Sequence, residues 1–143
     1  MAHDNDVALA QNLFERAPFM KHLGVRVIDA DATQVRAELT LEPWMTQATG
    51  VAHAGVVTAL ADHTAAAAAR ITTGDPDGIF VSIQVSTNLV RPASGPTLRA
   101  VGRTVNVGKR VAFAQAEIYN VAPEGHEKLC ATFSVSLICA PVK

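Results

Sequence analysis

The spacing of hydrophobic residues changes along the chain, and each spacing predicts a different kind of element. In residues 5–17 the apolar side chains recur at helical intervals, which predicts a first short helix that Pro18 ends. In residues 25–41 apolar and polar side chains alternate, apart from a polar interruption at residues 29–33. Alternation is typical of strands, so we expect two strands joined by a turn at that interruption.

Residues 50–71, GVAHAGVVTALADHTAAAAARI, are almost wholly apolar. They predict a helix of about 27 Å over residues 54–71. A helix that is apolar on all sides has to be covered on nearly every side. A single carboxylate, that of Asp62, nevertheless lies in its middle.

The remainder of the chain predicts four more strands, at residues 79–90, 97–107, 110–121 and 128–139. Short turns connect them, which favours antiparallel pairing. The simplest cover for the long helix is one curved sheet. We therefore expect a single α+β domain over residues 1–143, with a six-stranded antiparallel sheet wrapped around a long central helix and a short N-terminal helix.

Composition narrows the classes of partner. A chain of 143 residues that is 49% hydrophobic can build a full core. Its 12 basic and 13 acidic residues form no long basic run, so we expect neither nucleic acid nor a membrane as partner. The only candidate membrane span is interrupted by Asp62, His63 and Arg70, and the N-terminus lacks the pattern of a signal peptide. These features predict a soluble, cytoplasmic protein.

The two cysteines, Cys130 and Cys139, lie on one predicted strand. Nine residues of strand separate them by about 30 Å, which is too far for a disulfide. Two reduced thiols agree with a cytoplasmic location. The five histidines show no ligand spacing, so we expect no metal and no cofactor.

Asp62 is the first candidate for chemistry, because burying an unpaired carboxylate costs several kcal/mol. No basic residue lies three or four positions away, and only Thr58 offers a hydrogen bond from the preceding turn. Either Asp62 is structural, bonded to Thr58 and a distant strand, or it lines a pocket. In a pocket it could act as a nucleophile or activate a water.

The sequence HAG at residues 53–55, with Asp62 nine residues after His53, resembles a known family. In hotdog-fold acyl-CoA thioesterases of the phenylacetate-degradation (PaaI-like) type, a His-Gly-Gly turn opens the central helix and an acid follows at this spacing. The resemblance spans roughly residues 20–140. It includes Ser82, Arg91-Pro92 and the turn Gly108-Lys109-Arg110, and it departs from the family at Ala54, where Gly is usual.

The resemblance implies the hotdog fold and hydrolysis of an acyl-CoA thioester to a carboxylic acid and CoA, without a cofactor. It assigns Asp62 the role of nucleophile or general base. Gly55 lies at the helix start, where free amides and the helix dipole favour negative charge. Its amide is expected to polarise the thioester carbonyl, although a glycine required only for the turn or for packing is the alternative.

Three further polar residues are expected at the site. The Gln47 side chain could bond the thioester carbonyl or orient a water, or it could be an ordinary loop residue. His53 is expected to hold the loop of residues 47–55, with direct catalysis as the alternative. The Ser82 hydroxyl could position the attacking water, or it could be an ordinary polar group of a strand.

Substrate binding is expected from residues on strands and turns. Arg91, Lys109 and Arg110 could contact the phosphates of CoA, although charges at strand ends usually form a solvated rim. Val81 and Asn88, on the strand that follows the long helix, are also expected to contact the substrate.

One chain cannot complete this site. Gly55 and Asp62 are seven residues apart, so a rise of about 10 Å separates them on one helix. A reacting carbonyl has to lie within about 3 Å of both groups, so the second group has to come from another subunit. We therefore expect a homodimer with shared sites, and further a tetramer. The alternatives are a hotdog hydratase or dehydratase that pairs His53 with Asp62, and a non-catalytic module that binds acyl-CoA or lipid.

Overall fold

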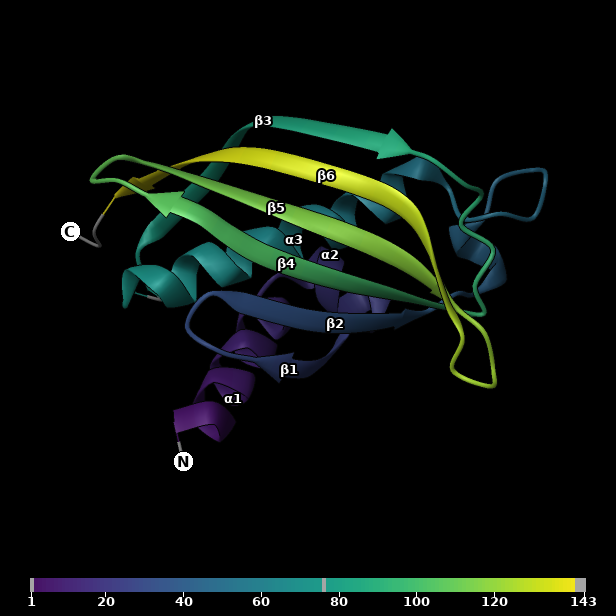
Figure 1. Ribbon diagram of the computed structural model, residues 1–143, viewed down its shortest axis with the longest axis horizontal. Helices are drawn as coiled ribbons and strands as arrows, with labels where there is room; N and C mark the ends of the chain where they lie inside the picture. Colours follow the sequence, from purple (N-terminus) through teal and green to yellow (C-terminus); the bar gives the residue numbers. More distant parts are fainter. Residues whose placement is uncertain (1, 76, 141–143) are drawn as a thin grey trace.

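A curved antiparallel sheet wraps one long helix in the computed structural model, which describes residues 2–75 and 77–140 (Figure 1). The sheet has six strands in the order β1-β2-β4-β5-β6-β3. This arrangement is the predicted hotdog fold. In chain order the elements are α1 (Ala2–Glu15), α2 (Pro18–Leu23), β1 (Arg26–Ala30), β2 (Gln34–Thr40), the 3₁₀ turn η1 (Pro43–Met45), α3 (Ala54–Thr73), β3 (Ile79–Leu89), β4 (Thr97–Val107), β5 (Val111–Val121) and β6 (Glu127–Ala140).

The predicted order of elements is confirmed, with strand ends shifted by a few residues, but two short elements were missed. These are α2 and η1, which are too short to show a period. The expectation that Pro18 ends the first helix was wrong. Helix α1 ends at Glu15, and Pro18 is the first residue of α2. Proline suits that position, because the first N–H of a helix has no intrahelical acceptor and the ring fixes a helical φ.

Helix α3 packs closely against the sheet because both surfaces carry small side chains. Most of its alanines are fully buried, and the inward-facing residues of β5 are Ala112, Ala114, Ala116 and Ile118. The closest approach is at Gly102 on β4. A Cβ added there would lie 2.6 Å from the carbonyl oxygen of Thr64 and 2.8 Å from the amide nitrogen of Ala65. Gly102 therefore sets the separation between helix and sheet.

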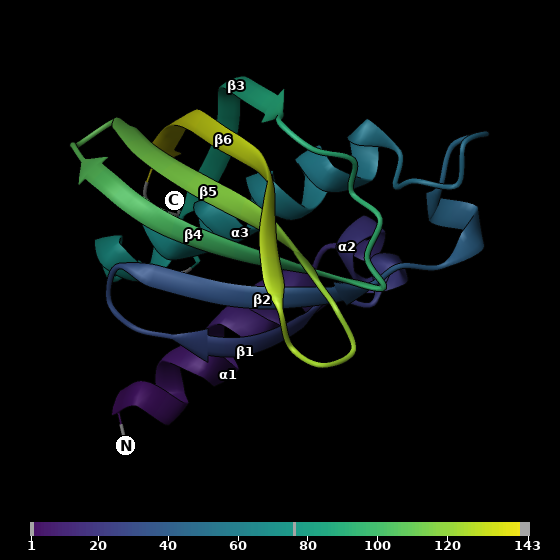
Figure 2. The ribbon, with the colours of Figure 1, turned by 45° about the vertical axis from the view of Figure 1, so that its right-hand side comes forward.

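Helix α1 covers the side of α3 that the sheet leaves open. Figure 2 shows α1 beneath the β1 edge of the sheet, and its residues Leu13 and Phe14 are buried. The Phe14 ring meets the His63 ring edge-on, with centroids 4.5 Å apart. The core is therefore closed by α1 as well as by the sheet.

Strand β3 is the edge of the sheet opposite β1, and it exposes hydrophobic side chains along its length. The exposed fraction lies between 45% and 53% for Ile79, Val81, Ile83, Val85 and Leu89. Within residues 2–75 and 77–140, only β6 pairs with β3. A long apolar edge strand is a ready template for pairing with another strand.

The outer face of the sheet carries ion pairs, together with exposed hydrophobic side chains such as Phe113 and Ile138. Arg103 on β4 donates to Glu117 on β5 at 2.6 Å. This hydrogen bond holds the pKa of the Glu117 carboxyl below its ordinary value. None of the described helices is both long and apolar enough to cross a membrane.

Cys130 and Cys139 are both buried and free, which confirms the prediction of two unpaired thiols. Burial raises the pKa of the Cys130 thiol to about 11. The thiol is therefore protonated near neutral pH and is a poor nucleophile.

The contact at Gly102 predicts a stability effect. Gly102→Ala should lower the free energy of unfolding by roughly 1–3 kcal/mol, because the new methyl group meets the backbone of α3 rather than a movable side chain. Denaturant unfolding measures the change. Gln115→Ala is the control, since Gln115 lies opposite Arg103 and is exposed. Equal stability of the two variants would contradict this account of the packing.

Candidate active site

The carboxylate of Asp62 meets the sheet at strand β3. Ser82 Oγ donates a hydrogen bond to Asp62 Oδ1 at 2.7 Å. Ser82 points inward, because it pairs with the buried Leu137 on β6. Thr58, which the sequence offered as a partner for Asp62, instead bonds Thr87 at 3.0 Å between the two hydroxyl oxygens. The partner of Asp62 is therefore a strand hydroxyl, and not the threonine of its own helix.

Asp62 and Ser82 line a cavity of about 320 Å³ between α1, α3 and β3. Most of the other lining residues are apolar: Leu13, Ala66, Ala67, Phe80, Val81 and Leu137. We call this space the carboxylate cavity. Asp62 is half-buried, so its carboxylate is open to a molecule that enters the cavity.

Two basic side chains also line the carboxylate cavity. His63 Nε2 lies 2.9 Å from the carbonyl oxygen of Leu13, so it donates to that oxygen. Burial lowers the pKa of His63, which keeps the ring neutral near pH 7. Arg70 lies 4.7 Å from the centre of the Phe80 ring and donates to the carbonyl of Gly78 at 3.4 Å. Burial also lowers the pKa of Arg70.

His53 caps the start of α3. Its Nδ1 accepts a hydrogen bond from the Gly55 N–H at 2.8 Å, and both residues are exposed. The backbone N–H of His53 donates to the carbonyl of Met45, which ties down the loop before the helix. The amide that was expected to face a carbonyl therefore has an imidazole as its acceptor in the free chain.

Gln47 and Arg91 lie together at the start of α3. Both line a second cavity of about 280 Å³ with Ala54, Leu89 and other residues, which we call the amide cavity. The loop that carries Gln47 is closed by a bond from the Gly50 N–H to the Gln47 carbonyl. The Arg91 guanidinium donates to the carbonyl of Leu129. The structure thus brings Gln47, the helix start and Arg91 to one place.

The remaining expected residues are Lys109 and Arg110 in the turn between β4 and β5, and Asn88 on β3. Lys109 and Arg110 form the turn before Val111, which is level with Val81 across β6. Lys109 and Arg110 therefore lie near the start of β3, whereas Arg91 follows the other end of that strand. Asn88 donates to Thr132 at 3.4 Å on the outer face and lines neither cavity. Its contact with substrate stays a prediction.

The two cavities are separate within one chain. Ser82 lines one and Leu89 the other, and seven strand residues correspond to about 23 Å. Arg70 was missed as a site residue. A signal was present, since Arg70 follows Asp62 by eight residues and so shares its helix face. Among the described residues no cluster of His, Cys, Asp or Glu is arranged to hold a metal ion.

The region that contains His53, Gly55, Asp62 and Ser82 matches a known protein family. The model of the family described as "Thioesterase superfamily" matches residues 49–125, which is more than half of the chain. The chain belongs to the thioesterase superfamily. With the fold, this confirms the prediction of a hotdog-fold member of the thioesterase superfamily. Membership supports thioester hydrolysis as the general activity.

Solved structures share the fold over nearly the whole chain. A thioesterase family protein from Silicibacter pomeroyi is 23% identical with a TM-score of 0.87, covering 96% of this chain and 99% of its own. The E. coli PaaI protein from the phenylacetic acid degradation operon is 22% identical with a TM-score of 0.79, covering 98% and 96%. Zebra fish thioesterase superfamily member 2 is 22% identical with a TM-score of 0.80, covering 98% and 99%. No curated protein sequence matches the chain significantly.

The cap at His53 predicts a stability effect that is separate from catalysis. His53→Ala should lower the free energy of unfolding by about 1 kcal/mol, because the Gly55 N–H loses its acceptor. His53→Asn should restore most of that stability, since asparagine is a favourable cap. Thermal or denaturant unfolding measures both variants. If the alanine variant is as stable as the wild type, the side-chain cap contributes nothing.

Proposed function

We propose that this chain is an acyl-CoA thioesterase in which the Asp62 carboxylate attacks the thioester carbonyl or activates the attacking water. The observation that carries the proposal is the carboxylate itself. It accepts one hydrogen bond, from Ser82, and opens into a cavity that is large enough for part of an acyl chain. A carboxylate held in this way keeps an oxygen available to a water or a carbonyl carbon.

The chemistry balances without a cofactor. As a general base, Asp62 takes a proton from water while the water oxygen bonds to the carbonyl carbon. The tetrahedral oxyanion then collapses, the carbon–sulfur bond breaks, and the proton passes to the CoA sulfur. As a nucleophile, Asp62 forms an acyl anhydride and releases CoA, and water then cleaves the anhydride. In both routes Ser82 positions the carboxylate.

The oxyanion needs a donor, and the Gly55 N–H at the start of α3 is the proposed one. An amide there combines a free N–H with the positive end of the helix dipole. The carbonyl oxygen has to replace His53 Nδ1 as the acceptor of this N–H. The Gln47 side chain, which lines the amide cavity, is proposed to bond the same carbonyl or a water.

The edge strand β3 supports a dimer that joins the two cavities. If β3 pairs antiparallel with the β3 of a second copy, the start of one strand lies beside the end of the other. The carboxylate cavity beside Ser82 then adjoins the partner's amide cavity beside Leu89. The same pairing covers the exposed hydrophobic side chains of β3. A carbonyl between the two cavities could reach Asp62 and the partner's Gly55.

This pairing also gathers the cations expected to bind CoA. Lys109 and Arg110 lie at the Val81 end of β3, and Arg91 follows its other end. Antiparallel pairing brings the partner's Arg91 toward Lys109 and Arg110. Three positive side chains at one entrance suit the phosphates of CoA. Val81 borders the carboxylate cavity, but its side chain shares the outer face of the sheet with Ile138, so its contact with the substrate stays a prediction.

The role of Asp62 predicts a specific loss of activity. Asp62→Asn should keep the fold and lower the rate of acyl-CoA hydrolysis by roughly 10²–10⁴-fold, because the amide is neither a base nor a nucleophile. Release of free CoA thiol measures the rate. Asp4→Asn is the matched control, since Asp4 is exposed on α1. Hydrolysis by the Asp62 variant at near wild-type rate would make Asp62 structural.

The shared site predicts complementation between two inactive variants. Asp62→Ala and Gln47→Ala are co-expressed, so that about half of the dimers are mixed and each mixed dimer carries one intact site. The mixture should regain about a quarter of wild-type activity if the two sites act independently. Each variant expressed alone is the control. Mixed dimers that are confirmed by mass and remain as inactive as their parents would exclude a site shared in this way.

A further inference from the structure

A third cavity, of about 320 Å³, adjoins the amide cavity. It lies between the connection that follows β3 and the hairpin that joins β5 to β6, and Figure 1 shows both at the same end of the sheet. We call it the hairpin cavity. Arg91 and Pro92 line the hairpin cavity as well as the amide cavity. A ligand with its reacting end in the amide cavity can therefore extend past Arg91 into the hairpin cavity.

The side chain of Asn120 fixes one wall of the hairpin cavity. Its Oδ1 accepts hydrogen bonds from the backbone N–H groups of Ser94 at 2.9 Å and Gly95 at 3.1 Å. Its Nδ2 donates to the carbonyl of Pro92 at 2.8 Å. The connection after β3 is thus bonded to β5 at three points. Because the backbone is already held, a ligand that enters the cavity orders little of it on binding.

Three basic side chains line the hairpin cavity: Arg91, His126 and Lys128. The Arg91 guanidinium is oriented by its hydrogen bond to the carbonyl of Leu129. Lys128 lies directly opposite Asn120 on the neighbouring strand, so both side chains are on the same side of the sheet. Lys128 and His126 are exposed, and neither side chain forms a hydrogen bond or ion pair with another described residue.

The hairpin cavity presents positive charge without a matching acid. None of the described residues that line it is acidic. Glu127, which separates His126 from Lys128 in the sequence, is bonded to Arg99 on β4. Glu124 belongs to the same hairpin but does not line the cavity. Hydrogen-bond donors with unbalanced positive charge are what a phosphate group requires.

The order of the anionic groups in CoA matches the order of the cavities. In a CoA thioester the pantetheine arm leads from the sulfur to a pyrophosphate, and the ribose beyond it carries a further phosphate at its 3′ position. In the proposed site the arm leaves the amide cavity past Arg91, which places the pyrophosphate there. His126 and Lys128 lie one cavity further on. A concave cavity suits a single ribose phosphate better than the convex surface of a carrier-protein helix.

We propose that the hairpin cavity binds the 3′-phosphate of CoA through His126 and Lys128, so that acyl groups are taken from CoA and not from a carrier protein. This inference rests on the proposed thioesterase function. The Lys128 ammonium and an N–H of the His126 ring donate to the phosphate oxygens, while Arg91 stays at the pyrophosphate. The contact is remote from the thioester and equal in ground state and transition state, so it lowers KM without raising kcat.

CoA and 3′-dephospho-CoA test the inference, because they differ only in this phosphate. Titration calorimetry on the wild type should give a Kd roughly 10-fold lower for CoA, and added salt should reduce the difference. Lys128→Met and His126→Gln should each weaken binding of CoA by roughly 3- to 10-fold and leave binding of dephospho-CoA unchanged. In hydrolysis assays both variants should raise KM for acyl-CoA and keep kcat.

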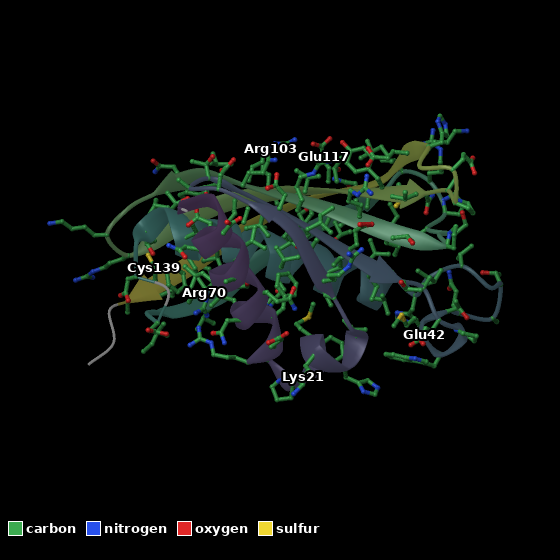
Figure 3. All side chains as sticks on the ribbon, turned by 90° about the horizontal axis from the view of Figure 1, so that it is seen from below. Lys21, Glu42, Arg70, Arg103, Glu117 and Cys139 are labelled. Carbon is green, nitrogen blue, oxygen red and sulfur yellow. The ribbon has the colours of Figure 1, made fainter. Side chains whose placement is uncertain are left out.

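The matched control is Lys21→Met, which should leave both affinities unchanged. Lys21 is exposed on α2 and does not line the hairpin cavity (Figure 3). Equal or unmeasurable affinities of the wild type for the two ligands overturn the inference. If the wild type still hydrolyses members of a panel of aryl, short-, medium- and long-chain acyl-CoAs, the proposed function stands.

Two further outcomes would also overturn the inference. If Lys128→Met lowers hydrolysis of an acyl group on a carrier protein more than hydrolysis of the same group on CoA, the hairpin cavity serves a carrier protein. If the folded wild type hydrolyses no acyl-CoA of the panel, the proposed function fails and the inference fails with it.

Discussion

The contact between α3 and the sheet at Gly102 determines how the helix is rotated, and the site depends on that rotation. Thr64 and Ala65 lie against Gly102 with no room for a Cβ. Thr64 follows Asp62 by two residues, so the two side chains point about 200° apart around the helix. Fixing Thr64 against β4 therefore turns Asp62 toward β3 and α1. Arg70 lies on nearly the same face of the helix as Asp62 and lines the same cavity.

Strand β3 connects the proposed chemistry of the site with the proposed assembly. Its inward side supplies Ser82 to Asp62 and Phe80 to Arg70. Its free edge carries apolar side chains that the chain itself does not cover. The same strand therefore orients the carboxylate and offers the surface for a second copy. In the proposed dimer, loss of the β3 pairing would separate the two cavities even where each half-site kept its own geometry.

Periodicity was enough to predict the fold, and the isolated acid made Asp62 the candidate centre of the site, but the sequence did not predict the contacts of Asp62. The bond between Ser82 and Asp62 depends on where a helix crosses a strand 20 residues later. The face on which the Asn88 side chain lies cannot be predicted by counting residues along the strand. Strict alternation places Asn88 on the same face as Ser82, yet the register shifts between Ser82 and Gln84. That shift turns Thr87 inward and Asn88 to the outer face.

If the oxyanion binds the Gly55 N–H as proposed, the His53 cap makes the start of α3 selective for the transition state. In the free chain the Gly55 N–H is satisfied by a neutral imidazole nitrogen. A ground-state carbonyl oxygen is also a neutral acceptor, so exchanging one for the other changes the free energy little. The oxyanion of the tetrahedral intermediate is charged and accepts a much stronger hydrogen bond. The exchange therefore favours the intermediate over the bound substrate, and binding energy that appears only there raises the rate.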